Sequence, residues 1–448
     1  MTEGLDDKKC EFELDVELTQ EYSKVKKYLI LLLVSSGGLL SPLASTIYFP
    51  SANNIINELN TTSNLFDVSI SAFMMCLGIF PLIWGGIADR FGRRWIFIIS
   101  LLIFIGSNIG AALAQSIEML IIMRIFQGVG SSAPLVVGVG VVSDIFPEKE
   151  RGVSISIFFS GTLVGPIIGP IIGGFLDTAF GWRSTFWFLT IFTSVIELLT
   201  LVFLPETLST RKPFPYQISL CPPSIKKVGS FFNPFSALIL MKYPIVLLGS
   251  LVPALTFGTF FAIESFHSRA MGEQYHLDSS SVGLSFLVLG AGSILGNFCG
   301  GKLSDVMNNR EKKKSMPTPE ARLHGLWACA SLLVGGLLAY GWFIEYKFPI
   351  WAPILATFFI GFGYTSGSIG ASAYLVDLAP NYASSITACA TFVRMTISTI
   401  TTGFNTPIIE GLGYGRGITI HASLSFIVVL ILVLLVFKGS SIRQKTGP

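Results

Sequence analysis

Twelve apolar runs, separated by polar connections, constrain this chain more than any other feature of its sequence. A helix that crosses the ~30 Å hydrocarbon layer of a bilayer needs ~20 apolar residues, and each run has about that length. Lipid offers no partner to backbone N–H and C=O groups, so each run is predicted to be a transmembrane helix. The runs lie near 28–49, 64–86, 95–114, 117–142, 152–176, 183–204, 243–265, 280–301, 323–343, 351–376, 383–407 and 416–437.

The composition excludes most other classes of protein. Of the 448 residues, 51% are hydrophobic and 13% are charged, whereas roughly 25% is charged in a soluble domain. The net charge of +3 is small, and the basic residues are scattered between apolar runs, which argues against nucleic acid as a partner. The six cysteines include no CxxC spacing and no outer-loop pair, so we expect neither a disulfide framework nor a metal site.

The distribution of lysine and arginine predicts that both termini are cytoplasmic, because cytoplasmic loops are enriched in these residues. With six plus six spans, only four of the 30 basic residues fall outside, and two more fall within spans. Those outside are Arg183, Arg269, Lys347 and Arg416, and those within spans are Arg124 and Arg394. The glycosylation acceptor Asn60-Thr61-Thr62 falls in the first outer loop, in agreement. The first 27 residues lack the features of a signal peptide, so we expect the first span to act as an uncleaved signal.

The two halves resemble each other. Gly85-Gly86-Ile87-Ala88-Asp89 recurs as Gly301-Lys302-Leu303-Ser304-Asp305, each time after the second span of its half. Parallel six-span repeats joined by a linker are the architecture of two-lobed transporters, with a substrate site between the lobes. The sequence therefore predicts a tail (1–27), a six-helix bundle (28–204), a cytoplasmic linker (205–242), a second six-helix bundle (243–437) and a C-terminal tail (438–448).

Three motifs carry a likeness to a known family. The segment Gly85–Arg94 resembles the loop 2–3 signature of the major facilitator superfamily, Arg124–Gly130 resembles its span 4 signature, and Gly161–Gly174 resembles the span 5 motif of its antiporters. Pro205-Glu206-Thr207 and Pro319–Leu323 look like fungal members of the twelve-span drug:proton antiporter family, nearest the quinidine-resistance, polyamine and dityrosine exporters. The resemblance implies an all-α polytopic fold with two pseudo-symmetric six-helix bundles.

The resemblance also implies roles for the loop and for span 5. In the family the loop latches the lobes in the outward-open state, and the span 5 motif makes a tight contact that shapes antiport. The loop residues are Gly85, Asp89, Arg90, Gly92, Arg93 and Arg94, and the span 5 residues are Gly161, Gly165, Pro166, Gly169, Pro170, Gly173 and Gly174. Plain positive-inside topology and generic helix packing are the alternatives. The second loop copy has Asn308 in place of Gly92, which puts a second latch in doubt.

Charged and polar residues inside spans are candidates for the transport pathway, since such residues are costly in lipid. Arg124 is expected to face the cavity with Gln127, and the resemblance implies a role in proton coupling; Arg394 and Asn297 are further candidates. Glu197 is the only acid well inside a span and is the first candidate to carry protons, with Asp67 and Glu264 as second choices near outer span ends. A structural ion pair is the alternative for each. Polar residues of span 1 and the aromatics Phe257, Phe261, Tyr364 and Tyr374 are candidates to line the pocket. His267 is expected in an outer loop.

Together these features predict a secondary transporter that exports small organic compounds, such as drugs, polyamines or weak organic acids, in exchange for protons. The alternatives are a proton-coupled uptake carrier and a non-transporting membrane receptor. No P-loop or catalytic constellation is evident, so we expect no enzyme activity and no cofactor beyond the proton gradient. We expect a multi-pass monomer in the plasma membrane, with the bilayer, a small organic substrate and protons as its partners.

Overall fold

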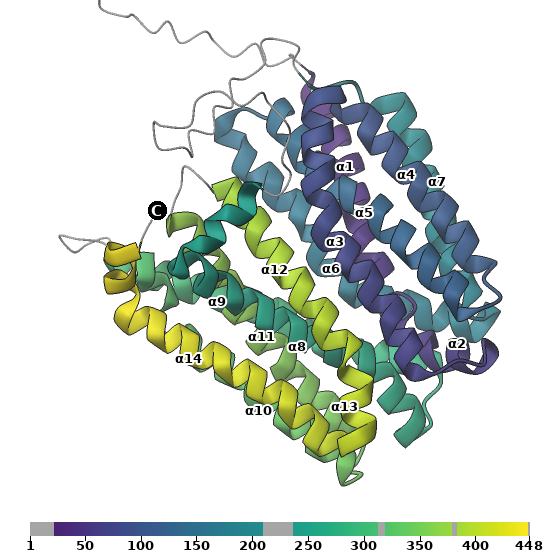
Figure 1. Cartoon of the computed structure of the whole chain (residues 1–448). Coiled ribbons are helices and arrows are strands. Elements are labelled where there is room, and N and C mark those ends of the chain that lie inside the picture. The colour runs from purple at the N-terminus through teal and green to yellow at the C-terminus, as the bar shows by residue number, and fades with distance from the viewer. Residues whose placement is uncertain (1–21, 209–235, 312–318, 379–382, 447–448) are drawn as a thin grey trace, which may run out of the picture.

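The computed structural model describes residues 22–208, 236–311, 319–378 and 383–446. Within these ranges it contains twelve helices of 20 residues or more, one for each predicted span (Figure 1). The helices are α1 (Lys24–Thr46), α3 (Ser63–Phe91), α4 (Arg93–Ala112), α5 (Ile117–Ile145), α6 (Glu148–Phe180), α7 (Arg183–Phe203), α8 (Pro244–Tyr275), α9 (Ser279–Glu311), α10 (Leu326–Glu345), α11 (Trp351–Leu378), α12 (Ala383–Gly403) and α14 (Tyr414–Thr446). Short helices connect them: η1 (Phe49–Ser51), α2 (Ala52–Glu58), η2 (Ser236–Lys242), η3 (Pro319–Leu323) and α13 (Asn405–Leu412).

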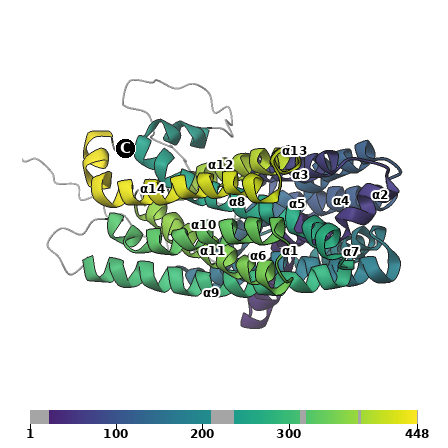
Figure 2. The same ribbon diagram turned by 90° about the horizontal axis from the view of Figure 1, so that it is seen from below.

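The helices form two lobes that are related by a repeat. In the N-lobe (α1–α7), α5 packs against both α3 and α4, and in the C-lobe (α8–α14), α11 packs in the same way against α9 and α10. The lobes meet mainly along two helix pairs, α3 with α12 and α6 with α9. Figure 1 shows α3 and α12 side by side, and Figure 2 shows the same bundle from below.

The two ends of the bundle are named here by their connections. The tail face is the end where α1 begins at Lys24 and α14 ends at Thr446. The distal face is the opposite end, with the connections at 47–62, 276–278 and 404–413. Each long helix runs from one face to the other, which positions side chains at defined depths between them.

Eleven helices of the described chain are long and apolar enough to cross a membrane by length and composition. The helix missing from that set is α12, which is rich in serine and threonine and carries Arg394. It nevertheless packs between α8 and α3, at the boundary of the lobes. A helix in this position contacts protein on two sides, so it needs less apolar surface than a peripheral one.

The expected position of His267 in an outer loop is wrong. The helix α8 continues ten residues beyond the predicted end of its span, to Tyr275, and His267 is 1% exposed. Its ring nitrogens lie 2.8 Å from Tyr340 Oη and 2.7 Å from Ser285 Oγ. The polar stretch after residue 265 resembles a loop in sequence, but partners on neighbouring helices satisfy its side chains and keep it helical.

The C-terminal tail predicted from residue 438 is helical as far as Thr446, because α14 continues through it. Arg443 Nε lies 3.5 Å from Glu320 Oε1 of η3, and Gly439 packs against the same glutamate. The last turns of α14 therefore pack against η3 at the tail face of the C-lobe. The linker predicted at 205–242 ends in η2. Residues 209–235 of the linker, which include Cys221 and most of its lysines, lie outside the described residues. The first 21 residues, which include Cys10, also lie outside them.

Glycines spaced four residues apart on α6 face α1 at very short range. A Cβ atom built on Gly165 would lie 2.7 Å from Pro42 Cβ, and one on Gly173 would lie 1.6 Å from Ile47 O. Gly161 and Gly169 belong to the same row, whereas Gly174 faces Ser279 O of α9 in the other lobe at 2.3 Å. With Pro166 and Pro170 inside it, α6 is a smooth helix between α1 and the C-lobe.

The substitution Gly173→Ala should destabilise the protein, because a methyl group at 1.6 Å from a backbone oxygen forces α6 and α1 apart. Overpacking of this kind costs about 1–3 kcal/mol, which should lower the midpoint of thermal denaturation in detergent. The matched control is Gly106→Ala, since nothing lies within 4 Å of its Cβ position on α4 and alanine favours a helix. Equal midpoints for the two variants would contradict the close contact.

Candidate functional site

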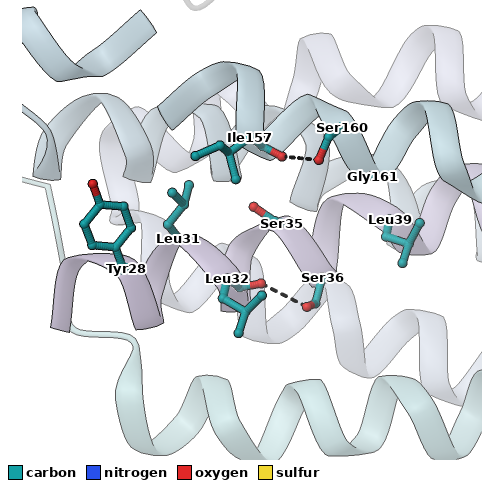
Figure 3. A pocket seen from close by; sticks show the side chains of 9 residues that line it. All are labelled: Tyr28, Leu31, Leu32, Ser35, Ser36, Leu39, Ile157, Ser160 and Gly161. Carbon is teal, nitrogen blue, oxygen red and sulfur yellow. Dashed lines mark hydrogen bonds between the residues drawn. The ribbon is translucent and has the colours of Figure 1, made fainter. Parts of the chain in front are cut away.

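A cavity of about 340 Å³ lies between α1 and α6 in the tail half of the N-lobe (Figure 3). Most of its lining is apolar, with three serines among the nine residues: Tyr28, Leu31, Leu32, Ser35, Ser36, Leu39, Ile157, Ser160 and Gly161. Ser36 Oγ donates to Leu32 O and Ser160 Oγ to Ile157 O, whereas Ser35 Oγ has no hydrogen-bond partner among the described residues. An apolar wall with few polar groups suits a lipophilic organic solute.

On the distal face a buried ion pair joins the two lobes. Asp67 of α3 and Arg269 of α8 lie 2.7 Å apart, and their side chains are 0% and 2% exposed. Arg269 also donates to Thr406 Oγ1 of α13 at 2.7 Å, and Thr406 donates to the second carboxylate oxygen of Asp67. We name these three residues the distal latch. Removing one partner of a buried pair leaves an uncompensated charge, so the latch holds the lobes together only while it is complete.

Further contacts close the distal face around the latch. Ser279 Oγ of α9 donates to Asp177 of α6, which also accepts a hydrogen bond at 2.7 Å from Asn54 of the same lobe. The rings of Phe49 and Phe261 meet across the lobe boundary with centroids 5.6 Å apart. The distal half thus combines polar and aromatic contacts between the lobes.

The interlobe ion pair and hydrogen bonds described above lie in the distal half of the bundle. The interlobe hydrogen bond farthest from the distal face is from Thr399 Oγ1 of α12 to Ser71 O of α3, at 3.4 Å. Toward the tail face, the close approaches of Gly78 to Met395 and of Gly290 to Ile167 follow. The structure therefore shows the lobes in contact on the distal face, and the cavity between α1 and α6 lies in the tail half of the N-lobe.

Gly92, Arg93 and Arg94, at the connection between α3 and α4, contact residues of the N-lobe. Gly92 (φ +99°) ends α3, and a carboxylate, Glu206, accepts hydrogen bonds from the backbone N–H groups of Arg93 (2.9 Å) and Arg94 (3.2 Å). An anion at a helix N-terminus is stabilised by the helix dipole. Arg93 Nε also lies 2.8 Å from Asp144 of α5. The loop is thus anchored to its own lobe in this conformation.

The C-lobe repeats this charge arrangement with different residues. Arg322 of η3 pairs with both Asp377 of α11 and Asp305 of α9, the latter at 2.9 Å. In the N-lobe, Arg93 pairs with Asp144 and, at 3.7 Å, with Asp89. Asn308 is 6% exposed, on an α9 that continues past the point where Gly92 ends α3. The sequence comparison missed this second arrangement because its arginine lies 17 residues after Asp305 instead of four.

Arg124 is enclosed within the N-lobe. Its Nη1 donates to Ala44 O of α1 at 2.9 Å and to Gln127 Oε1 at 2.7 Å, and the rings of Phe73 and Tyr48 lie 4.1 and 4.3 Å from its guanidinium carbon. The expected neighbour Gln127 is present, but the side chain of Arg124 is 0% exposed instead of facing an open cavity. Its Nε and Nη2 have no hydrogen-bond partner in the described chain. A guanidinium held by carbonyls and rings still has donors to offer.

Arg394 lies within an aromatic cluster at the lobe boundary. Its guanidinium carbon is 5.4 Å from the Phe257 ring of α8, and Tyr364 of α11 stacks on Phe260 with centroids 4.3 Å apart. The Tyr364 ring also lies 5.9 Å from the Phe257 ring, centroid to centroid. The structure thus brings together Phe257, Tyr364 and Arg394, which the sequence analysis nominated separately.

Glu197 and Asn297 do not join this cluster in the structure. Glu197 is 4% exposed and neither carboxylate oxygen has a hydrogen-bond partner among the described residues, but its helix α7 packs on α4, α1 and α6 of its own lobe. Asn297 is half-buried on α9. Asn60 is exposed between α2 and α3 on the distal face.

The described geometry agrees with comparisons to known proteins. The sequence model of the Major Facilitator Superfamily matches residues 34–403. The chain belongs to the major facilitator superfamily. As a member of this family it is a multi-pass membrane transporter and not an enzyme, and its all-α architecture is the fold of the family.

Curated relatives extend the match over most of the chain. It is 32% identical to the MFS transporter fsa7 of Fusarium sp., over 93% of this chain and 84% of the relative. Citrate exporter 1 of Aspergillus niger is 27% identical, over 87% of this chain and 82% of the exporter. The MFS antiporter QDR3 of Candida albicans is 25% identical, over 96% and 80%.

Solved structures share the fold. A bacterial homologue of the human lysosomal transporter Spinster, in an inward-facing and unoccupied conformation, aligns with a TM-score of 0.72 at 17% identity, over 95% of this chain and 99% of that one. A D-xylose–proton symporter aligns with a TM-score of 0.72 at 15% identity, over 90% and 97%.

The distal latch was missed by sequence analysis. Arg269 falls in the stretch that resembles a loop, and Thr406 has no charge, so only Asp67 was noticed, as a possible carrier of protons. The signal that could have found the latch is that one acid and one arginine lie near the distal ends of two spans, one in each lobe: Asp67 is four residues from the distal end of α3, and Arg269 is six residues from the distal end of α8.

Replacing Asp67 with asparagine should open the distal face, because Arg269 would then lie buried without its counter-charge, at a cost of about 3–5 kcal/mol. The readout is labelling of Ser71→Cys, at the lobe boundary and 7% exposed, by an impermeant maleimide in a variant without native cysteines. Labelling should accelerate at least about tenfold.

The exchange of both residues, Asp67→Arg with Arg269→Asp, is the matched control and should return labelling toward the slow rate. Equally slow labelling in Asp67→Asn would show that the ion pair does not hold the distal face shut.

Proposed function

We propose that this protein is a proton-coupled exporter of small organic compounds that works by alternating access. The observation that carries the proposal is the closure of the lobes at the distal face by a buried ion pair and aromatic contacts, together with a cavity between α1 and α6 in the tail half of the N-lobe. A rocking motion about the solute would break the distal contacts and form new ones at the tail face. Two of the relatives described above are named as an antiporter and an exporter, which supports the direction.

We place the tail face in the cytoplasm and the protein in the plasma membrane. Lys24, Lys26, Arg90, Arg151 and Lys302 are among the basic residues of this face, in accord with the excess of positive charge in cytoplasmic segments. The distal-closed structure is then the inward-open state, ready to take up a solute from the cytoplasm. A largely apolar cavity favours drugs, polyamines with apolar parts or weak organic acids over sugars.

The loop between α3 and α4 supplies a latch for the opposite state in this proposal. Asp89 has a side chain that is 68% exposed at the tail end of α3, next to α12 of the other lobe. When the tail face closes, this carboxylate would reach the end of α12, where a helix N-terminus favours an anion. Glu206 and Asp144 keep the arginines of the loop in place through the transition.

Glu197 remains our proposal for the group that carries protons, with Arg124 and Gln127 as the polar centre of the same lobe. A buried carboxylate without hydrogen-bond partners exchanges between a neutral form that suits this site and an ionised form that needs a new partner. A change in the surroundings of α7 between the two states would supply or remove that partner. Proton binding is thereby linked to the state of the lobe.

Uptake by proton symport is the second candidate, favoured by one observation: the same fold occurs in a D-xylose–proton symporter. Direction of flux separates the two. A receptor that does not transport would show no flux in either direction.

Purified protein in vesicles with an imposed pH gradient should exchange protons for lipophilic cations, polyamines or weak organic acids. Because an exporter uses inward proton flow, solute and protons should move in opposite directions, and a protonophore should collapse solute accumulation. Accumulation that persists without the gradient would reject proton coupling, and co-directional movement would favour symport.

The variant Glu197→Gln should lose gradient-driven flux by at least about a hundredfold, since glutamine keeps the shape of the side chain but does not titrate. Counterflow, which exchanges solute for solute without net proton movement, should persist. The control is Glu118→Gln, at an exposed acid on the distal face. Unchanged gradient-driven flux in Glu197→Gln would exclude Glu197 as the carrier.

Expression in a glycosylating host tests the orientation. If the distal face is extracellular, Asn60 is exposed on the glycosylated side, and Asn60→Gln should remove any shift in mobility caused by an N-glycosidase. Asn60 lies near the membrane, so an acceptor inserted between Ala114 and Gln115 is the second reporter. Lack of glycan at both positions, with glycan on an acceptor inserted in the tail-face linker, would invert the orientation.

A further inference from the structure

Glu264 of α8 is a buried acid that has no role in the proposed mechanism. Its side chain is 1% exposed, and neither carboxylate oxygen has a hydrogen-bond partner in the described chain. Buried charges in proteins are normally paired or hydrogen-bonded, because an isolated one is costly. A carboxylate held in this way beside the lobe boundary is suited to a cationic partner that arrives from outside the protein.

Aromatic rings surround one side of Glu264. Phe260 and Phe261 precede it by one helical turn on α8, and Tyr364 of α11 stacks on Phe260 with centroids 4.3 Å apart. Phe257 stacks on Phe261 at 5.5 Å and lies 5.9 Å from Tyr364. These rings form an aromatic cluster, and the faces of such rings attract an ammonium group as well as aromatic bodies.

Arg394 of α12 provides a positive charge at the other end of the cluster. Its guanidinium already lies over the Phe257 ring at 5.4 Å, and its Nε is buried without a hydrogen-bond partner among the described residues. Tyr364 packs against Phe257, over which Arg394 lies, and against Phe260, one helical turn before Glu264. Arg394 would repel a simple cation from this region, whereas an anionic group would satisfy its free donor.

The two charges lie well apart along the helix. Arg394 lies over the ring of Phe257, which is seven residues from Glu264 on α8. Seven residues correspond to about 10 Å along the helix axis at 1.5 Å per residue. Side chains of this length leave room for an aromatic ring between two bound groups. A solute with both charges on one carbon would reach only one of these ends.

We propose that Glu264, Tyr364, Phe257 and Arg394 form a two-ended substrate subsite that takes a zwitterion with an aromatic body. Glu264 binds the protonated amine, Arg394 binds the carboxylate at the opposite end, and the rings stack on the body between them. The inference rests on the proposed function for its meaning in transport, since the subsite lies where the lobes meet, but binding itself requires no gradient.

Calorimetry on the purified full chain in detergent tests the subsite with three matched probes. They are 4-(aminomethyl)benzoate, which carries both charges across one ring, benzylamine, which carries only the amine, and benzoate, which carries only the acid. The zwitterion should bind at least about tenfold more tightly than either single-charge probe, which corresponds to ~1.4 kcal/mol.

Two variants separate the ends of the subsite. Glu264→Gln should weaken the zwitterion to about the affinity of benzoate while leaving benzoate unchanged, and Arg394→Gln should weaken it to about that of benzylamine. Arg394→Lys keeps the charge and should retain part of the affinity, which provides a reading if Arg394→Gln does not fold. Glu118→Gln, on the distal surface, should bind all three probes as the parent does.

Other outcomes would overturn the subsite. Tightest binding of benzoate with no effect of Glu264→Gln would assign the region to anions alone, and tightest binding of benzylamine with no effect of Arg394→Gln would assign it to cations alone. No binding of any probe to folded protein would also reject it. Because these titrations use no pH gradient, selective zwitterion binding without flux would instead count against the proposed antiport and leave the subsite standing.

Discussion

The ion pair between Asp67 and Arg269 is the interaction on which the arrangement of the two lobes depends. Both side chains are almost fully buried, and Thr406 bonds to each of them. The desolvation of two charges is repaid only when their geometry is complete, so the pair favours a sharply closed distal face over a partly open one. That property is useful in a transporter, because intermediate openings on both sides would let protons and solutes leak.

The other features of the molecule fit around this closure. The glycine row of α6 keeps α1 close within the N-lobe, while Gly174 and the first turn of α9 form a second contact between the lobes. Separate charge clusters around Arg93 and Arg322 brace the tail ends of the two lobes. Each lobe is therefore braced as a unit, and the interlobe ion pair and hydrogen bonds given above lie in the distal half of the surface between them. A rocking motion needs lobes that are rigid inside and that can move relative to each other.

The sequence was sufficient to predict features that depend on the bilayer, such as the number of membrane-spanning helices. It was not sufficient to predict features that depend on contacts between residues far apart in the chain. The apolar runs, the repeat and the family motifs predicted the number of helices and the fold, because hydrophobic length is a local property. The polar end of α8 was taken for a loop, although partners on other helices bury His267 and Arg269. The extension of α14 was missed for the same reason, since Glu320 and Arg443 are far apart in sequence. Phe257, Tyr364 and Arg394 were each nominated, but only the fold shows that they share one place.

The central claim is that the distal and tail faces open in alternation. Spin-label distances measure it directly, with one label pair on the distal face (Gln115 and Gly411) and one on the tail face (Gly152 and Asn309). In the parent protein, conditions that change the state, such as a lower pH or an added substrate, should lengthen the distal distance while they shorten the tail distance. Distances that lengthen together, or that stay fixed while the protein transports, would contradict alternating access by these two lobes.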